Sequence, residues 1–220
     1  MTYEHVYIYL LVPLGAYMAG SIPFGLLLCL LIKGVDIREH GSKNIGATNA
    51  GRVCGWQFFA AAFTLDFLKG LLSVLAGMWI IHWLEADANI EAMKILYGAF
   101  AIIGHTFPAY LGFKGGKAVA TGFGVFTALA PVAAGMAFVI FAIVLALFRY
   151  VSLASIFGAI AAPLAFAYQH RHDLDEHMTI LSFTIIIALV VILRHHANIR
   201  RLLAGNENRV TFKTKTKQTE

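Results

Sequence analysis

Four short polar motifs hold the residues whose types suit chemistry. They are GSKNIGATNAGR (41–52), GHTFPAYLGFKGGKAVATGFG (104–124), RYVSLASI (149–156) and RHHANIRRLLAGNE (194–207). Their cations include Lys43, Arg52, Lys114, Lys117, Arg149, Arg194 and Arg200. Their neutral hydrogen-bonding side chains include Ser42, Asn44, Thr48, Ser152, Ser155 and Asn198. The motifs also contain glycines, which let the backbone approach a ligand closely.

This combination favours the binding of phosphate groups. Glycine-rich loops offer N–H groups to phosphate oxygens, and lysine and arginine add full positive charge. Only the carboxylates of Asp36, Glu39 and Glu207 accompany the cations, so the set suits phosphorylated ligands and does not suit a divalent metal cage. The stretch GFKGGK (112–117) is not a nucleotide P-loop, because a Walker A motif would require glycine where Lys117 stands.

The rest of the chain is apolar enough for a membrane protein. Of its 220 residues, 59% are hydrophobic and 13% are charged. Apolar runs at 6–32, 53–84 and 178–193 reach or approach the roughly 20 residues that a helix needs to cross a bilayer. The first run is not expected to be a cleaved signal peptide, because Glu4 precedes it and a basic leader is missing. We expect an all-α polytopic membrane protein. Its net charge of +5 indicates basic residues that interact with anionic lipid headgroups, and not binding to nucleic acid.

The distribution of basic residues predicts the topology. Lysine and arginine gather at 33–52, at 112–121 and in the tail from Arg194, whereas 85–94 and 169–177 are acidic. The positive-inside rule places the basic zones in the cytoplasm. All three basic zones lie in the cytoplasm only if the apolar run 118–148 breaks into a hairpin near Ala130-Pro131. We therefore predict about seven transmembrane helices, a short limb at 118–130, an outside N-terminus and a cytoplasmic C-terminus.

Three further patterns have simple interpretations. Asp66 and Lys69 lie one helical turn apart in an apolar run, and we expect a neutralised ion pair in preference to a proton relay. The pattern His-x4-Asp, which another acyltransferase class carries, occurs at 82–87 and 170–175, but both copies fall in acidic outside loops. His170, His172 and His177 could form a metal site, although solvated histidines are the preferred interpretation.

Together with SIPFG at 21–25, the four motifs resemble those of the bacterial acyl-phosphate:glycerol-3-phosphate acyltransferases, the PlsY family. The resemblance runs from the first apolar run to about Glu207. It implies transfer of a fatty acyl group from acyl phosphate to the 1-hydroxyl of sn-glycerol 3-phosphate. The products would be lysophosphatidic acid and inorganic phosphate, in phospholipid synthesis, with no cofactor. It also implies a seven-helix integral membrane fold with an outside N-terminus.

The resemblance assigns roles to positions in each motif. Ser42, Asn44, Thr48 and Lys114 are the expected catalytic residues. The resemblance implies that the loop around Ser42 and Asn44 serves the acyl phosphate. The residues that it implies for holding glycerol 3-phosphate are Arg52, Lys114, Ser152, His195 and Asn198. The expected substrate-binding residues are Gly41, Lys43, Gly46, Arg52, His105, Gly115, Gly116, Lys117, Arg149, Ser152, Ser155, His195 and Asn198.

Direct acyl transfer is the expected mechanism, because acyl phosphate is already activated and needs mainly alignment and charge neutralisation. Asn44 and nearby N–H groups would hold the carbonyl oxygen. The base is left open between a donor phosphate oxygen, whose second pKa is about 6, and His105 or His195. An acylated Ser42 is the less favoured alternative, because no His–Asp pair stands beside it in the sequence.

A transporter for a phosphorylated metabolite is the alternative function, since cationic loops and a short helical hairpin would suit it too. The two halves show no convincing repeat, which favours the enzyme. We expect one transmembrane domain over 1–207, in the cell (inner or plasma) membrane, with its site facing the cytoplasm. A disordered basic tail is expected over 208–220. A soluble enzyme that makes acyl phosphate is the partner that the resemblance implies.

Overall fold

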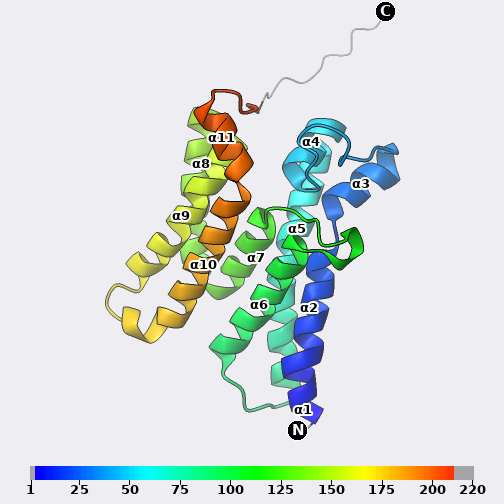
Figure 1. Cartoon of the computed structure of the whole chain (residues 1–220). Helices are drawn as coiled ribbons and strands as arrows, with labels where there is room; N and C mark the ends of the chain where they lie inside the picture. The colour runs from blue at the N-terminus through cyan, green and yellow to red at the C-terminus, as the bar shows by residue number, and fades with distance from the viewer. Residues whose placement is uncertain (1–2, 211–220) are drawn as a thin grey trace, which may run out of the picture.

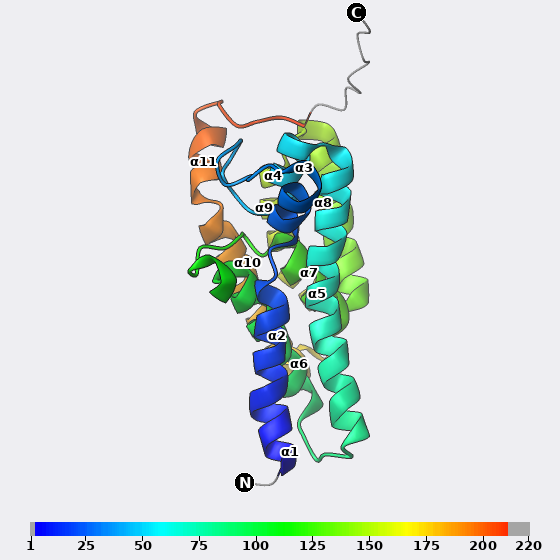
Figure 2. The same cartoon turned by 90° about the vertical axis from the view of Figure 1, so that its right-hand side faces the viewer.

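The chain folds into a bundle of helices in the computed structural model, which describes residues 3–210 (Figures 1 and 2). The described residues form helices and no strands, which confirms the predicted all-α fold. The elements are α1 (Tyr3–Val6), η1 (Tyr7–Leu11), α2 (Val12–Ser21), α3 (Phe24–Lys33), α4 (Ala47–Cys54), α5 (Trp56–Trp83), α6 (Ile90–Thr106), η2 (Ala109–Leu111), α7 (Val119–Leu129), α8 (Pro131–Phe148), α9 (Val151–Gln169), η3 (Leu174–His177), α10 (Met178–Arg194) and α11 (His196–Leu203).

Several of these helices are long and apolar enough to cross a membrane. Among the described residues, α5, α8, α9 and the stretch Leu174–Arg194 meet that criterion. The segments Tyr3–Ser21 and Phe24–Lys33 meet it together, with a bend of 45° between them. The bend falls at Ile22, which is extended (ψ 116°) because it precedes Pro23. The membrane fold is thus confirmed, while the number of about seven crossings stays a prediction, because α6 and α7 have only 17 and 11 residues.

The predicted break in the apolar run 118–148 is confirmed. Helix α7 ends before Ala130, whose non-helical backbone (φ −149°, ψ 77°) precedes α8, and Pro131 is the first residue of α8. Proline suits this position, because the first N–H group of a helix has no partner within the helix. The two helices run in opposite directions (Figure 1). The first limb, α7, is short as expected, at about 16 Å for a rise of 1.5 Å per residue.

Two glycines bring α5 and α7 into backbone contact at the centre of the bundle. A Cβ atom on Gly70 would lie 2.2 Å from the carbonyl oxygen of Thr121. A Cβ atom on Gly124 would lie 2.0 Å from the carbonyl oxygen of Phe67. Only glycine permits this approach, which fixes α7 against α5 and so fixes the segment that precedes α7.

The polar motifs gather toward one end of the bundle. The elements α3, α4 and α11 lie at the end where the described chain finishes, opposite the end where it starts (Figures 1 and 2). The acidic turns after α5 and α9 lie away from α4 and α11 (Figure 1). Residues 208–210 also contact this end: the N–H of Val210 donates to the carbonyl oxygen of Arg149 at 2.8 Å, and Arg209 donates to the Tyr150 hydroxyl at 2.9 Å. The remainder of the predicted disordered tail, 211–220, lies outside the described residues.

Candidate active site

Asn49 holds the loop at 41–46 in shape. Its buried side chain donates to three carbonyl oxygens of the segment 37–44, at 2.8 to 3.1 Å, and accepts the N–H of Ser42 at 2.8 Å. Gly41 has a φ of 60°, and a Cβ there would lie 2.4 Å from the Oδ1 of Asn49. Lys43 also has a positive φ, of 58°. Gly41 and Lys43 therefore allow the loop to turn tightly. This turn brings Ser42 and Asn44 to the same side of the loop.

The side chain of Asn44 is oriented by the backbone that follows it. Its Oδ1 accepts the N–H of Gly46 at 2.9 Å, so its Nδ2 protons are the donors that it can offer to a ligand. Gly46 then caps the N-terminus of α4 with extended backbone. Thr48 and Arg52 lie one turn apart on this helix, on the side that faces the cavity described next.

A polar cavity of about 120 Å³ lies where the four motifs meet. Its walls come from the loop before α4, from α4, α5 and the end of α6, and from the segment that leads into α7. The rest of the wall comes from α8 and α9, from His195 and α11, and from residues 207, 208 and 210. The expected site residues that line it are Ser42, Asn44, Gly46, Thr48, Arg52, His105, Lys117, Ser152, Ser155, His195 and Asn198.

The remaining expected site residues lie outside this lining: Gly41, Lys43, Lys114, Gly115, Gly116 and Arg149. Lys114 is exposed on the loop before α7, so the loop presents Lys117, and not Lys114, to the cavity. Arg149 is exposed as well and ends α8 with a φ of 61°.

Gly115 and Gly116 wrap the loop around His105 and Arg194. The guanidinium of Arg194 donates to both glycine carbonyl oxygens, at 2.9 and 2.8 Å, and the N–H of Gly116 donates to the carbonyl oxygen of His105 at 3.0 Å. A Cβ on Gly116 would lie 2.2 Å from the His105 ring nitrogen Nε2. These glycines therefore position Lys117 through the backbone.

Glu207 supplies the negative charge in the cavity wall, and sequence reasoning gave it no role. Its carboxylate accepts hydrogen bonds from Ser152 at 2.9 Å, from Asn198 at 2.6 Å and from Arg201 at 2.6 Å. Its burial opposes ionisation, but the hydrogen bonds from Asn198, Arg201 and Ser152 outweigh that effect and lower the pKa of Glu207. The carboxylate is thus an anion that orients three groups from α9 and α11.

A second cation, Lys117, joins Glu207 through Asn198. Its ammonium donates to the Oδ1 of Asn198, whose Nδ2 donates to Glu207. Burial, together with the nearby charges of Arg201, Arg52 and Arg194, lowers the pKa of Lys117 to about 8, against the opposing effect of Glu207. Burial likewise lowers the pKa of Arg52. The cavity wall carries the cations Arg52, Lys117 and Arg201 against Glu207, while its other carboxylate, Asp66, is paired with Lys69. This excess of positive charge suits a phosphate site.

His195 lies in the cavity wall as a neutral imidazole. Its Nδ1 lies 2.7 Å from the carbonyl oxygen of Val191, so Nδ1 carries the proton and Nε2 is the acceptor. Burial and the charge of Lys117 lower the pKa of His195 to about 4. A base this weak is better suited to orienting a hydroxyl than to removing its proton.

Asp66 and Lys69 form the expected ion pair, with 2.7 Å between Oδ1 and Nζ. Lys69 also donates to the carbonyl oxygen of Ile22 at 2.7 Å, at the bend between α2 and α3. The Oδ1 of Asp66 lies 3.7 Å from the Nδ1 of His105, and both of these side chains line the cavity. The pair thus neutralises charge within α5 and satisfies a carbonyl group that the bend leaves without a helical partner.

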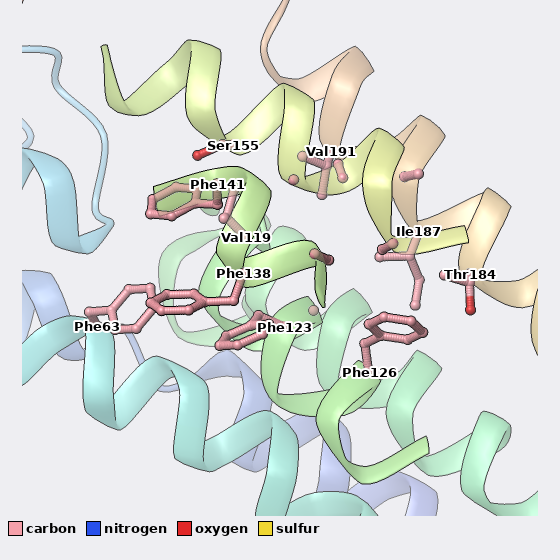
Figure 3. Close-up of a pocket in the computed structure, with 16 residues that line it drawn as sticks. Phe63, Val119, Phe123, Phe126, Phe138, Phe141, Ser155, Thr184, Ile187 and Val191 are labelled. Atoms are coloured by element: carbon pink, nitrogen blue, oxygen red, sulfur yellow. The ribbon is translucent and has the colours of Figure 1, made fainter. Parts of the chain in front are cut away.

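A second cavity, of about 90 Å³, is apolar (Figure 3) and lies next to the first. It lies among α5, α7, α8, α9 and α10, and five phenylalanines contribute to its lining. Phe63, Val119, Phe141 and Ser155 line both cavities. In Figure 3, Ser155 lies at one end of the group, whereas Phe126 and Thr184 lie toward the other. The polar cavity and the apolar cavity therefore adjoin along a shared wall.

Comparison with known proteins agrees with this geometry. The family model described as glycerol-3-phosphate acyltransferase matches residues 10–205. The chain belongs to the glycerol-3-phosphate acyltransferase family. The relative from Trichlorobacter lovleyi with that name is 45% identical over 195 residues, which cover 89% of this chain and 94% of the relative.

Solved structures of family members share the fold. The crystal structure of PlsY (YgiH), an integral membrane glycerol 3-phosphate acyltransferase, in its glycerol 3-phosphate form has a TM-score of 0.78 and 38% identity, and covers 92% of this chain and 95% of that one. The lysophosphatidic acid form of the same protein has a TM-score of 0.76 and 37% identity, with the same coverage. The resemblance found in the motifs is thus confirmed: this chain is a membrane acyltransferase, and nothing in these comparisons supports a transporter.

Proposed function

We propose that this glycerol-3-phosphate acyltransferase uses acyl phosphate as its donor and acylates the 1-hydroxyl group of sn-glycerol 3-phosphate. The observation that carries the proposal is the junction of the polar cavity with the apolar cavity at Phe63, Val119, Phe141 and Ser155. A donor with a phosphate head and a fatty chain can place its reacting carbonyl at this junction. The glycerol 3-phosphate and lysophosphatidic acid forms of PlsY support the choice of acceptor and product.

In this proposal the acceptor phosphate is held by Arg52 and Lys117, with Ser152, His195 and Asn198 around the glycerol. All five line the polar cavity. Lys117 and Asn198 are already joined by a hydrogen bond, so they meet the ligand as one unit. Lys and Arg offset the repulsion between the acceptor phosphate and the donor phosphate, which is the main electrostatic obstacle to the reaction.

The donor carbonyl and phosphate are assigned to the loop at 41–46 and to the start of α4. Asn44 would donate from Nδ2 to the carbonyl oxygen as negative charge develops there, because its Oδ1 is occupied by Gly46. Ser42 and Thr48 would hydrogen-bond the donor phosphate from the same side of the cavity. The acyl chain would then extend between α7, α8 and α9, past Phe123 and Phe138.

The reaction is then a direct transfer. The 1-hydroxyl oxygen of the acceptor attacks the acyl carbon, the bond from that carbon to the phosphate oxygen breaks, and the departing phosphate takes the hydroxyl proton. A phosphate oxygen with a pKa of about 6 is a better base than His195 in this wall, whose pKa is lowered to about 4. Within the described residues, no imidazole hydrogen-bonds to Ser42, which argues against a seryl acyl-enzyme.

We propose that the protein lies in the cell membrane and that its active site faces the cytoplasm. The basic segments 33–52 and 194–210 lie at the same end of the bundle as the polar motifs, which supports this orientation through the positive-inside rule. Acyl phosphate would be delivered there by a soluble enzyme that makes it.

The test uses purified protein in lipid nanodiscs with palmitoyl phosphate and sn-glycerol 3-phosphate. We expect equimolar release of inorganic phosphate and 1-palmitoyl-lysophosphatidic acid, and no product with palmitoyl-CoA. Arg52→Ala is the inactive control, and Arg38→Ala, which changes an exposed arginine of the preceding loop, is the matched active control. Turnover with palmitoyl-CoA alone would overturn the choice of donor while leaving the family assignment intact.

A further inference from the structure

Two imidazoles and one carboxylate meet in the turn between α9 and α10. His170 follows the last residue of α9, Asp173 precedes η3, and His177 ends η3 just before α10. One possible ligand atom from each of the three lies within 4.8 Å of the others. The turn lies at the opposite end of the molecule from α11, so this cluster is separate from the polar cavity (Figure 1).

Each histidine lies at a zinc-site spacing from the carboxylate of Asp173. The Nδ1 of His170 lies 3.4 Å from one oxygen of Asp173, and the Nε2 of His177 lies 3.3 Å from the other oxygen. In a tetrahedral zinc site with bonds of about 2.0 to 2.2 Å, neighbouring ligand atoms lie about 3.3 to 3.5 Å apart. The two imidazole rings lie 4.0 Å apart between centroids, so both flank the same carboxylate.

Packing holds the two rings in place. The buried ring of Phe166 lies beneath them, with its centroid 4.7 Å from that of His170 and 6.2 Å from that of His177. The Nε2 of His170 lies 3.2 Å from the Nε2 of Gln169. A cation on Nδ1 leaves Nε2–H as a donor, so metal binding requires the Gln169 side chain to turn its amide oxygen toward this nitrogen.

The charges in the turn also favour a cation. The exposed carboxylates of Asp175 and Glu176 lie in the same turn as Asp173. Arg171, the basic residue of the turn, is directed to Tyr168, with its guanidinium 5.0 Å from the ring centroid and a hydrogen bond of 3.2 Å to the carbonyl oxygen. Its charge is therefore engaged outside the cluster.

We propose that His170, Asp173 and His177 bind one divalent transition-metal cation of the Zn²⁺ class. Two imidazole nitrogens with one carboxylate oxygen suit Zn²⁺, whereas Ca²⁺ and Mg²⁺ prefer ligand sets made of oxygen. Water would complete the tetrahedron. The cation joins the end of α9 to the start of α10 and so stabilises this helix pair, without taking part in acyl transfer. His172, which sequence reasoning grouped with these histidines, is exposed and lies outside the cluster.

The test measures Zn²⁺ binding to the full chain, purified without a histidine tag and stripped with EDTA. Isothermal titration is expected to give one Zn²⁺ per chain, and the thermal unfolding midpoint is expected to rise when Zn²⁺ is added. His170→Gln and His177→Gln should each weaken Zn²⁺ binding by about tenfold or more. His172→Gln is the matched control from the same turn and should bind as the wild type does. Ca²⁺ and Mg²⁺ should give no heat of binding at this site.

Acyltransferase turnover in EDTA, unchanged in all three variants, shows that each has folded, because this turn is remote from the polar cavity. Zn²⁺ binding of equal affinity and stoichiometry in the wild type and in His170→Gln and His177→Gln would overturn the proposal. Loss of Zn²⁺ binding in His172→Gln alone would overturn the proposed set of ligands. A wild-type chain that binds no Zn²⁺ would reduce the cluster to two His–Asp ion pairs.

Discussion

Lys117 and Asn198, 81 residues apart in the chain, are joined by a hydrogen bond from Nζ to Oδ1. The bond ties the segment before α7 to α11, and through the Nδ2 of Asn198 it continues to Glu207. We expect Lys117→Met to lower turnover by about 10²-fold, because it removes a buried cation from the phosphate site. Lys114→Met, which changes the exposed lysine of the same loop, should keep turnover within about threefold of the wild type. Phosphate release checks both variants, and an equal loss in the two would show that the cavity lining does not identify the functional lysine.

The pH dependence of acceptor binding follows from Lys117. Since burial lowers the pKa of this lysine to about 8, the ammonium loses its proton as the pH rises past that value. The KM for glycerol 3-phosphate should therefore be low below about pH 8 and rise above it, instead of rising near the ordinary lysine pKa of about 10.4. If active, Lys117→Arg should remove this alkaline rise, because arginine stays protonated over the whole range. An unchanged rise in that variant would assign the titration to another group, or to the substrate.

Glu207 is expected to stabilise the fold. Glu207→Ala removes the carboxylate that accepts hydrogen bonds from Ser152, Asn198 and Arg201. The free energy of unfolding should therefore fall by about 1–3 kcal/mol. Since the folded pKa of Glu207 lies below its ordinary value of 4.5, this stabilisation is complete above about pH 4.5 and is lost as the pH falls through the folded pKa. Thermal unfolding in detergent at neutral and acidic pH checks the prediction. Glu39→Ala, at an exposed position, is the control, and an equal loss there would contradict it.

The apolar cavity is expected to set the length of the acyl chain. Ala162 lies seven residues beyond Ser155 on α9, about 10 Å further from the polar cavity at 1.5 Å per residue. Ala162→Phe should therefore shift preference from palmitoyl phosphate toward lauroyl phosphate in a competition assay, with little change in the KM for glycerol 3-phosphate. Leu164→Phe, on the exposed side of the same helix, should leave the preference unchanged. The prediction fails if both variants keep the wild-type ratio.

Ser42 and Asn44 should differ in their contribution. With direct transfer, Ser42→Ala loses a hydrogen bond to the donor and should reduce turnover by about tenfold or less. Asn44→Ala loses the proposed donor to the carbonyl oxygen and should cost about 10²- to 10³-fold. Intact-mass measurement after mixing wild-type protein with palmitoyl phosphate alone should detect no palmitoylated chain. A palmitoyl group recovered on Ser42 would replace direct transfer by a covalent mechanism.

The sequence was informative where a local rule dictates structure. Proline at 131 predicts the break between α7 and α8, because it removes a helix hydrogen bond, and the structure has that break. The ion pair of Asp66 with Lys69 follows from i,i+3 spacing alone. The bend at Ile22 was missed, although Pro23 signals it, since the apolar run 6–32 reads as one continuous span.

The missed features all depend on contacts between distant segments. Glu207 had no assigned role, because nothing in its neighbours indicates that the chain after α11 folds back onto Ser152. Asn49 stands in a motif, but its burial beneath the loop is visible only in three dimensions. The choice between Lys114 and Lys117 needs the loop path that Arg194 imposes. The apolar cavity has no sequence signal, since phenylalanine is expected on any lipid-facing helix.

The position of Glu207, Asn208 and Val210 in the cavity wall bears on the order in which the enzyme is made. A chain synthesised as far as α10 already contains every helix that meets the membrane criterion, together with the loop at 41–46. It has neither Asn198 nor Glu207, so Lys117 and Arg52 lack the opposite charge that Glu207 supplies in the complete chain. We therefore expect insertion into the bilayer to precede activity, because activity requires the segment after α11 to be translated and packed against the cavity.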